Sequence, residues 1–375
     1  MAKFSKNKTP GGLRLAWDKI YDKYLVHVPF LQRMLFIHHL QIMTKAGLSI
    51  ISALQILSDE IENTKLKAVA TDIKLEVEKG KQLSEAVAKY PKIFPAIYVS
   101  MIAAGESSGK MEKALDEIYI QMKKSQELSS KVKGAMIYPA IVMIAMTGIA
   151  IEVVVFVLPK LMVLFADFKA ELPLPTKILI KITAFGQVIF TTYWGLIALA
   201  VIIGLAYAWH KSYAKPEVKS MVHRLILRFP IVGPIIKQIN LAHFTLTLSS
   251  LLDSAIPIIE AVNISAEVLS NVIYKQNLQA TAESLKKGQQ LSSILAKYPE
   301  TFPPMVTEMI MVGEETGEVE HLLKELADYY GGEVDTTMRN FSTVIEPVII
   351  LVLGLAVAGI AVAVIMPMYS LAESF

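Results

Sequence analysis

The sequence contains no cysteine, and this absence excludes three kinds of chemistry. Disulfide bonds, thiolate metal sites and a cysteine nucleophile all depend on that side chain. The seven histidines are scattered, and no spacing among them matches a zinc site. His38 and His39 are the closest pair, but adjacent residues of a helix point to different sides. We therefore expect no metal and no cofactor.

Charged residues are scarce as well. They make up 19% of the chain, below the usual share of about 25%, whereas 53% of the residues are hydrophobic. With a mean hydropathy of +0.46, this composition indicates a membrane protein that keeps substantial regions outside the bilayer. The net charge is only +3, so no nucleic-acid partner is expected.

No catalytic constellation is evident. The segment Gly105–Gly109, GESSG, lacks the lysine-serine ending and the preceding strand that a phosphate-binding loop requires. Ser107 and Ser108 have no residue at a suitable spacing to act as a base. The sequence therefore predicts a protein that is not an enzyme.

What the sequence does contain is a long internal repeat. Lys89–Gly109 reads KYPKIFPAIYVSMIAAGESSG, and Lys297–Gly317 reads KYPETFPPMVTEMIMVGEETG. Residue numbers in the second copy are larger by 208 throughout, without an insertion. A constant offset of this kind indicates one structural unit that is used twice.

The residues around each copy predict short amphipathic helices and no strands. Leu35, Ile42 and Met43 fall on one side of a first helix, which is expected to end at Gly47. Further helices are predicted after a Ser49 cap, from a Thr64 cap to Gly80, over Leu83 to Lys89, from Pro95 to Gly105, and from Lys110 toward Ser130. The fold class is therefore all-α, with two homologous bundles of about six helices each.

Three apolar runs complete the chain: Met136–Leu158, Val188–Trp209 and Val344–Met366. Each has about 22 residues, enough to cross about 30 Å of hydrocarbon as a helix. The first and third runs also obey the repeat, because Tyr138-Pro139 aligns with Glu346-Pro347. The repeated unit therefore combines a bundle with a transmembrane helix, and the second run is a return crossing.

The chain is accordingly divided into eight parts. They are a basic arm (1–33), a first bundle (34–134), transmembrane helix 1 (135–159), an external connector (160–186), transmembrane helix 2 (187–210), a second bundle (211–342), transmembrane helix 3 (343–368) and a short external tail (369–375). Lysine and arginine are concentrated before the first span and after the second. The positive-inside rule then predicts a multi-pass protein with both bundles in the cytoplasm.

Two groups of residues are candidate functional sites. Gly105, Glu106, Gly109 and their equivalents Gly313, Glu314 and Gly317 form either a tight helix connection or a loop that docks a partner. In the first case glycine supplies a positive φ, and the acid lies near the next helix's N-terminus.

The second group lies in the predicted spans and comprises Tyr138, Pro139, Glu152, Glu346 and Pro347. A charge at the bilayer centre costs about 3 kcal/mol, so an acid there is a functional candidate. Glu346 lies near enough to the span's end to reach the interface. For Glu152 three roles stay open: a neutral acid, a pair with another helix, or contact with a passing substrate helix.

The chain resembles the type II secretion system F domain family. The resemblance is carried by the combination of bundle and span, the segment KAGLSIISALQIL, the paired GESSGK and GEETGE sequences, and Tyr138-Pro139 with Pro159. This family comprises inner-membrane platform proteins of type IV pilus assembly (PilC-type) and type II secretion (GspF-type). The resemblance covers about residues 30 to 372. One departure is Ala255-Ile256-Pro257, which replaces Gly47-Leu48-Ser49, so this turn is expected to be built differently.

The resemblance implies a scaffold that couples a hexameric cytoplasmic ATPase to the insertion or extraction of pilin or pseudopilin subunits. It also implies contacts with other inner-membrane assembly proteins and membrane lipid, and a homo-oligomer. The alternative is a subunit of a membrane transporter or channel, but the predicted spans lack the polar stripe that would line a path.

Overall fold

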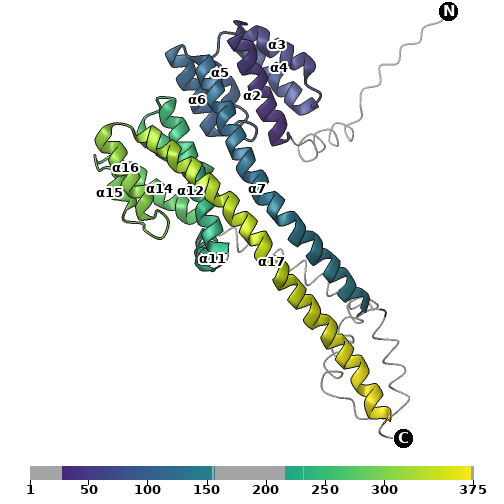
Figure 1. Ribbon diagram of the computed structural model, residues 1–375. Coiled ribbons are helices and arrows are strands. Elements are labelled where there is room, and N and C mark those ends of the chain that lie inside the picture. Colours follow the sequence, from purple (N-terminus) through teal and green to yellow (C-terminus); the bar gives the residue numbers. More distant parts are fainter. Residues whose placement is uncertain (1–27, 154–155, 157–215, 231, 373–375) are drawn as a thin grey trace, which may run out of the picture. The chain divides into compact units, whose positions relative to one another are not determined.

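The computed structural model describes residues 28–153, 156, 216–230 and 232–372, and within these ranges the chain is helical and has no strand (Figure 1). The expected all-α architecture is therefore confirmed for this part of the chain. The chain divides into two compact units. One combines Met1–Leu128 with Lys237–Gly331 and contains both bundles, and the other combines Ser129–Ile236 with Gly332–Phe375.

Several segments predicted from the sequence lie outside these described ranges. Most of the basic arm, the connector 160–186, transmembrane helix 2 (187–210) and the end of the tail lie outside the described residues. Pro159, which ends the first predicted span, also lies outside them.

The first bundle is built from consecutive helices that pack on their chain neighbours. They are α2 (Phe30–Lys45), α3 (Ile50–Glu60), α4 (Thr64–Glu78), α5 (Leu83–Ala88), α6 (Ala96–Ser108) and the first turns of α7 (Met111–Glu152). The core is apolar and fully buried, with Phe36 of α2 packed against Phe94 at a ring separation of 5.8 Å. Burial of such side chains stabilises each by about 1.5–3 kcal/mol and supplies most of the packing energy.

The second bundle repeats this arrangement. Its helices are α12 (Val232–Asp253), α13 (Ile258–Val268), α14 (Val272–Leu285), α15 (Leu291–Leu295), α16 (Pro304–Thr316) and the first turns of α17 (Val319–Ala372), preceded by α11 (Pro216–Arg228). Phe244 packs against Phe302 at 5.2 Å. These two residues are 208 positions beyond Phe36 and Phe94, so the repeat extends into the core.

Three helix ends differ from the sequence prediction. Asn63, rather than Thr64, caps α4, because its Oδ1 accepts a hydrogen bond from the amide of Leu66 at 3.0 Å. Helix α6 does not end at Gly105 but continues to Ser108. The bundle helix predicted from Lys110 and the first predicted span, as far as Glu152, form one helix, α7, and Pro139 lies inside it.

The apolar stripe predicted on the first helix does not face the core. Leu35 and Ile42 have exposed fractions of 40% and 48%, whereas Phe36, Ile37 and Leu40 on the opposite side are buried. The predicted helix is therefore confirmed, and its buried side is the one that carries Phe36, Ile37 and Leu40.

The turn between the first two helices of each bundle has the same backbone in both copies. Gly47 has φ +85° and Ala255 has φ +60°, and the next amide bonds back to Met43 O in one copy and Leu251 O in the other. The backbone at this position is therefore the same in both copies, whereas the helix start that follows does differ. Ser49 accepts a hydrogen bond from the amide of Ser52, and Pro257 at the equivalent position makes no side-chain cap. Backbone hydrogen bonds from the amides of Ala255 and Ile256 accompany the left-handed conformation of the alanine, which L residues other than glycine rarely adopt.

This comparison predicts opposite effects of two substitutions. Gly47→Ala is expected to destabilise the protein by about 1 kcal/mol, because nothing lies within 4 Å of the added methyl and only the backbone conformation is strained. Ala255→Gly is expected to be neutral or stabilising by up to about 1 kcal/mol. Thermal unfolding of the detergent-solubilised chain would measure both. A neutral Gly47→Ala would contradict the account.

Among the described residues, two helices are long and apolar enough to cross a membrane, Met111–Ile149 within α7 and Val319–Gly359 within α17. Only 6% and 0% of their most apolar windows are buried inside the protein, so these surfaces are available to lipid. The bent pair of helices α11 and α12, taken together as one segment, is also long and apolar enough to cross a membrane. However, Phe244, Leu248 and Leu251 of α12 are buried in the second bundle.

Candidate functional site

The repeated glycine-glutamate motif lies on a helix, and its acid holds a neighbouring short helix. Glu106, near the end of α6, accepts hydrogen bonds from the amides of Leu83 and Ser84 and from the Ser84 hydroxyl. These groups form the first turn of α5, whose amides have no partner within the helix. The carboxylate therefore caps a helix that begins 23 residues earlier in the chain.

The second copy makes the same contacts. Glu314 accepts from the amides of Leu291 and Ser292, at 2.6 and 3.2 Å, and from the Ser292 hydroxyl. The prediction placed this acid near the start of the helix that follows it. The structure places it instead against the short helix α15, and its charge is used there.

The two glycines of each motif have different roles. Gly109 and Gly317 follow the last turn and have φ of +66° and +77°, which ends α6 and α16 in a left-handed cap. Gly105 and Gly313 are helical and mark close contacts instead. A methyl group on Gly105 would collide with Cβ of Ala114, and one on Gly313 would lie 2.8 Å from Cα of Val319. Each of these glycines therefore lets the long helix lie directly against its predecessor.

A second polar site joins the two bundles within their common unit. Gln121 of α7 donates to the Thr247 hydroxyl at 3.3 Å and accepts from the Ser250 hydroxyl at 3.0 Å. All three side chains are buried. Lys113 also pairs with Asp253 at 3.1 Å. The contact thus combines a buried hydrogen-bonded centre with a charged rim, as protein interfaces do.

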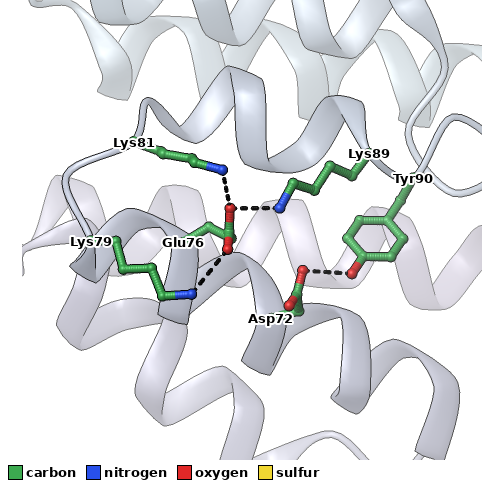
Figure 2. Close-up of polar contacts among 6 residues, drawn as sticks. All are labelled: Asp72, Glu76, Lys79, Lys81, Lys89 and Tyr90. Carbon is green, nitrogen blue, oxygen red and sulfur yellow. Dashed lines mark hydrogen bonds and ion pairs between the residues drawn. The ribbon is translucent and has the colours of Figure 1, made fainter.

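A third site is a lysine cluster on the first bundle, defined by Lys79, Lys81 and Lys89 around Glu76 (Figure 2). The Nζ atoms of Lys81 and Lys89 each lie 2.5 Å from Glu76 Oε2, and that of Lys79 lies 3.2 Å from Oε1. These hydrogen bonds lower the pKa of Glu76 to about 2. The acid is therefore ionised at neutral pH, and the three lysines leave a local net charge of +2.

Beside the cluster, the Tyr90 hydroxyl donates to Asp72 Oδ2 at 2.7 Å (Figure 2). Burial, followed by the hydrogen bond to Asp72, raises the pKa of Tyr90 to about 12. Sequence reasoning missed both contacts. A comparison of the two copies would have singled out Glu76 and Asp72 as positions that differ, because Ser284 and Ala280 stand at the equivalent positions.

The candidate residues in the predicted spans lie on the two long helices. Tyr138 and Glu152 are exposed on α7, Pro139 is buried, and Glu346 and Pro347 are exposed on α17. Glu152 is the last residue of α7. In the part of the chain that the structure describes, no group of three or more histidines or acids could hold a metal ion.

These features define a class: a helical protein with a duplicated unit, in which each copy of a bundle leads into a long apolar helix. The family described as type II secretion system protein F matches residues 36–159 and 244–367. Both ends of the second match are 208 residues beyond those of the first, in agreement with the repeat. The chain belongs to this family.

Named relatives cover most of the chain. The type IV pilus assembly protein PilC of Thermus thermophilus is 33% identical over 92% of this chain and 86% of its own length. PilC of Myxococcus xanthus is 32% identical over 90% and 80%. The type II secretion system protein F of Vibrio cholerae is 28% identical over 89% and 80%.

The helix cap provided by Glu106 predicts a stability defect. Glu106→Gln should destabilise the protein by about 2 kcal/mol, because the amide replaces a charged acceptor and turns one donor toward another. Glu314→Gln should have the same effect. Glu315→Gln is the control, since Glu315 is exposed and its position is Ser107 in the first copy. Chemical denaturation would measure all three, and a partner-binding defect without a stability defect in Glu106→Gln would instead support a docking role.

The close helix crossings predict a second defect. Gly105→Ala and Gly313→Ala should each destabilise by about 1–3 kcal/mol, because the added methyl forces the two helices apart. Gly331→Ala on α17 is the control, since nothing lies within 4 Å of its added methyl. It should be neutral or stabilising by up to about 1 kcal/mol. Equal effects of Gly105→Ala and Gly331→Ala in thermal unfolding would refute the crossing argument.

Proposed function

We propose that this chain is the inner-membrane platform protein of a type IV pilus assembly or type II secretion machine. It links a cytoplasmic hexameric ATPase to the insertion or extraction of pilin or pseudopilin subunits. The observation that carries the proposal is the duplicated unit of bundle and long apolar helix, which matches the family twice in one register. Relatives of both kinds align with this chain over most of their length.

In this proposal the chain crosses the membrane several times, and both bundles lie in the cytoplasm. The lysines before the first predicted span, Lys131 and Lys133, support this orientation under the positive-inside rule. The long helices α7 and α17 run without a break from a bundle into an apolar segment. A displacement of either bundle would therefore be transmitted along a rigid helix rather than absorbed by a loop.

We assign the motor contact to the lysine cluster of the first bundle. Its three side chains have exposed fractions of 66%, 48% and 42%, so they are available to a partner with an acidic surface. The second bundle lacks the cluster, because Ser284 and Gln289 stand where the first has Glu76 and Lys81. An asymmetry between two otherwise equivalent bundles supports a partner that binds one of them.

The platform role is tested by affinity purification of the tagged chain from gently solubilised native membranes, followed by mass spectrometry. A hexameric secretion-type ATPase and pilins or pseudopilins are expected, and the type of pilin would decide between pilus and secretion. Recovery of a transport partner without either component would refute the platform role.

The motor contact is tested in the same purification with two matched variants. Lys79→Gln with Lys89→Gln should reduce ATPase recovery and leave pilin recovery unchanged. The equivalent pair in the second bundle, Lys287→Gln with Lys297→Gln, should leave both unchanged. Equal loss of ATPase from the two variants, or no loss from the first, would show that the lysine cluster is not the motor contact.

A further inference from the structure

The contact between the two bundles of this chain joins two different faces of the repeated unit. The first copy contributes α7, through Gln121, and the second contributes α12, through Thr247 and Ser250. Each copy contains both faces, because α2 is equivalent to α12 and α17 to α7. The buried centre of the contact within one chain therefore uses α7 of the first copy and α12 of the second. Helix α17 adds one ion pair at the edge of this contact, between Asp328 and Lys124. The faces equivalent to the buried centre, on α2 of the first copy and on α17 of the second, are left.

The remaining face of α2 is exposed and apolar. Leu35, His39 and Ile42 lie on one stripe of the helix, and Lys45 follows one turn later, all exposed. At the positions equivalent to His39 and Ile42, Thr247 and Ser250 are only 0% and 7% exposed. The first copy thus presents a larger apolar surface at a place where the second is covered by a bundle.

The remaining face of α17 is also exposed, and it carries an aromatic residue beside polar ones. His321, Glu325 and Tyr329 are exposed at positions equivalent to Lys113, Glu117 and Gln121. Tyr329 has an exposed fraction of 46%, whereas Gln121 has 3%. A buried polar residue in the first copy is thus replaced by an exposed aromatic residue in the second, and tyrosine is among the residues enriched at interfaces.

A neighbouring pair of helices extends both surfaces. Within the chain, α6 of the first copy lies against α13 of the second. Met311 and Val312 of α16 are 43% and 46% exposed, at positions where α6 has Ala103 and Ala104. Ile56 of α3 is 38% exposed, whereas its equivalent on α13, Ile264, is 7% exposed. These side chains add exposed apolar groups to each of the two surfaces, and clusters of such groups typically mark interaction sites.

We propose that a second copy of this chain covers these surfaces, with α17 of one copy on α2 of the next, in the geometry of the internal contact. In this geometry Tyr329 lies opposite Ile42 and His39. Their equivalents in the internal contact are Gln121, which bonds to Ser250 and Thr247. Glu325 likewise lies opposite Lys45, because these residues are equivalent to Glu117 and Asp253, which face each other in the internal contact. The two surfaces are therefore complementary in both apolar character and charge, which is why a second copy fits them.

Such a contact is heterologous, because each copy contributes a different face. A heterologous contact continues from copy to copy until a ring closes or a filament grows. The inference rests on the repeat and on the exposed residues, and it does not depend on the proposed motor contact.

Cysteine cross-linking tests the contact cleanly, because the chain has no cysteine of its own. The full-length variant carrying Ile42→Cys and Tyr329→Cys, oxidised in native membranes, should form covalent dimers and larger species. Each single variant should form none, because a heterologous contact brings neither residue beside its own copy. The matched control, Gln121→Cys with Ser250→Cys, should form a disulfide within one chain and so report that the internal contact is present.

Three outcomes would overturn the proposal. The first is a cross-linked control without intermolecular products from the Ile42 and Tyr329 pair. The second is a control variant, Gln121→Cys with Ser250→Cys, that forms no internal disulfide. The internal contact, whose geometry the proposed contact copies, would then be absent. The third is a dimer formed equally by Ile42→Cys alone, which would indicate a two-fold contact instead.

A charge exchange gives an independent test of the same surfaces. Lys45→Glu and Glu325→Lys should each cause loss of the cross-linked species in the Ile42 and Tyr329 background, because like charges then face each other. The two changes together should restore it. A loss that the double exchange does not restore would contradict the predicted pairing of Lys45 with Glu325.

Discussion

The bundles depend on one interaction, the capping of a short helix by a distant carboxylate. A helix of five or six residues has few internal hydrogen bonds and is not stable by itself. Glu106 and Glu314 supply acceptors for the first amides of α5 and α15 and tie each to the helix that follows. Gly105 and Gly313, one position earlier, let the long helix cross at close range. Because both features lie on the same turn, the cap also fixes the direction in which α7 and α17 leave the bundle.

Duplication gives this protein two such units with nearly the same backbone and different surfaces. The aromatic core pair and the carboxylate cap recur in both copies, as the Phe36–Phe94 and Phe244–Phe302 pairs show. Other buried positions differ, because Leu57 and Ile73 of the first copy are replaced by Ser265 and Thr281 in the second. The copies also differ in the lysine cluster around Glu76 and on the exposed faces of α2 and α17. The same helices are therefore built with different side chains, and the varied surfaces let one fold contact different partners.

Much of the fold could be predicted from the sequence, because caps and turns are local signals. Ser49 as an N-cap, the helix stops at Gly47 and Gly80, and the repeat register itself are all confirmed. Two features could not be predicted. The partners of Glu106 lie 22 and 23 residues away, so this cap depends on a tertiary contact. Ala255 adopts a left-handed conformation that alanine rarely takes, so its residue type gives no signal for it.

The exposed stripe of α2 shows a further limit of prediction. Helical periodicity finds a row of apolar residues but cannot tell a core from an interface, because both exclude water. The sequence predicts only that Leu35 and Ile42 share one side of a helix, and the structure shows that this side is exposed.

The central claim is that the two bundles lie on the same side of the membrane and act there as one duplicated unit. Labelling of single cysteines with a membrane-impermeant maleimide, in intact spheroplasts, tests it most directly. We expect Ser107→Cys and Glu315→Cys, one on each bundle, to be labelled only after lysis, and Lys169→Cys in the connector to be labelled before it. Labelling of one bundle cysteine before lysis and of the other only after it would contradict the account.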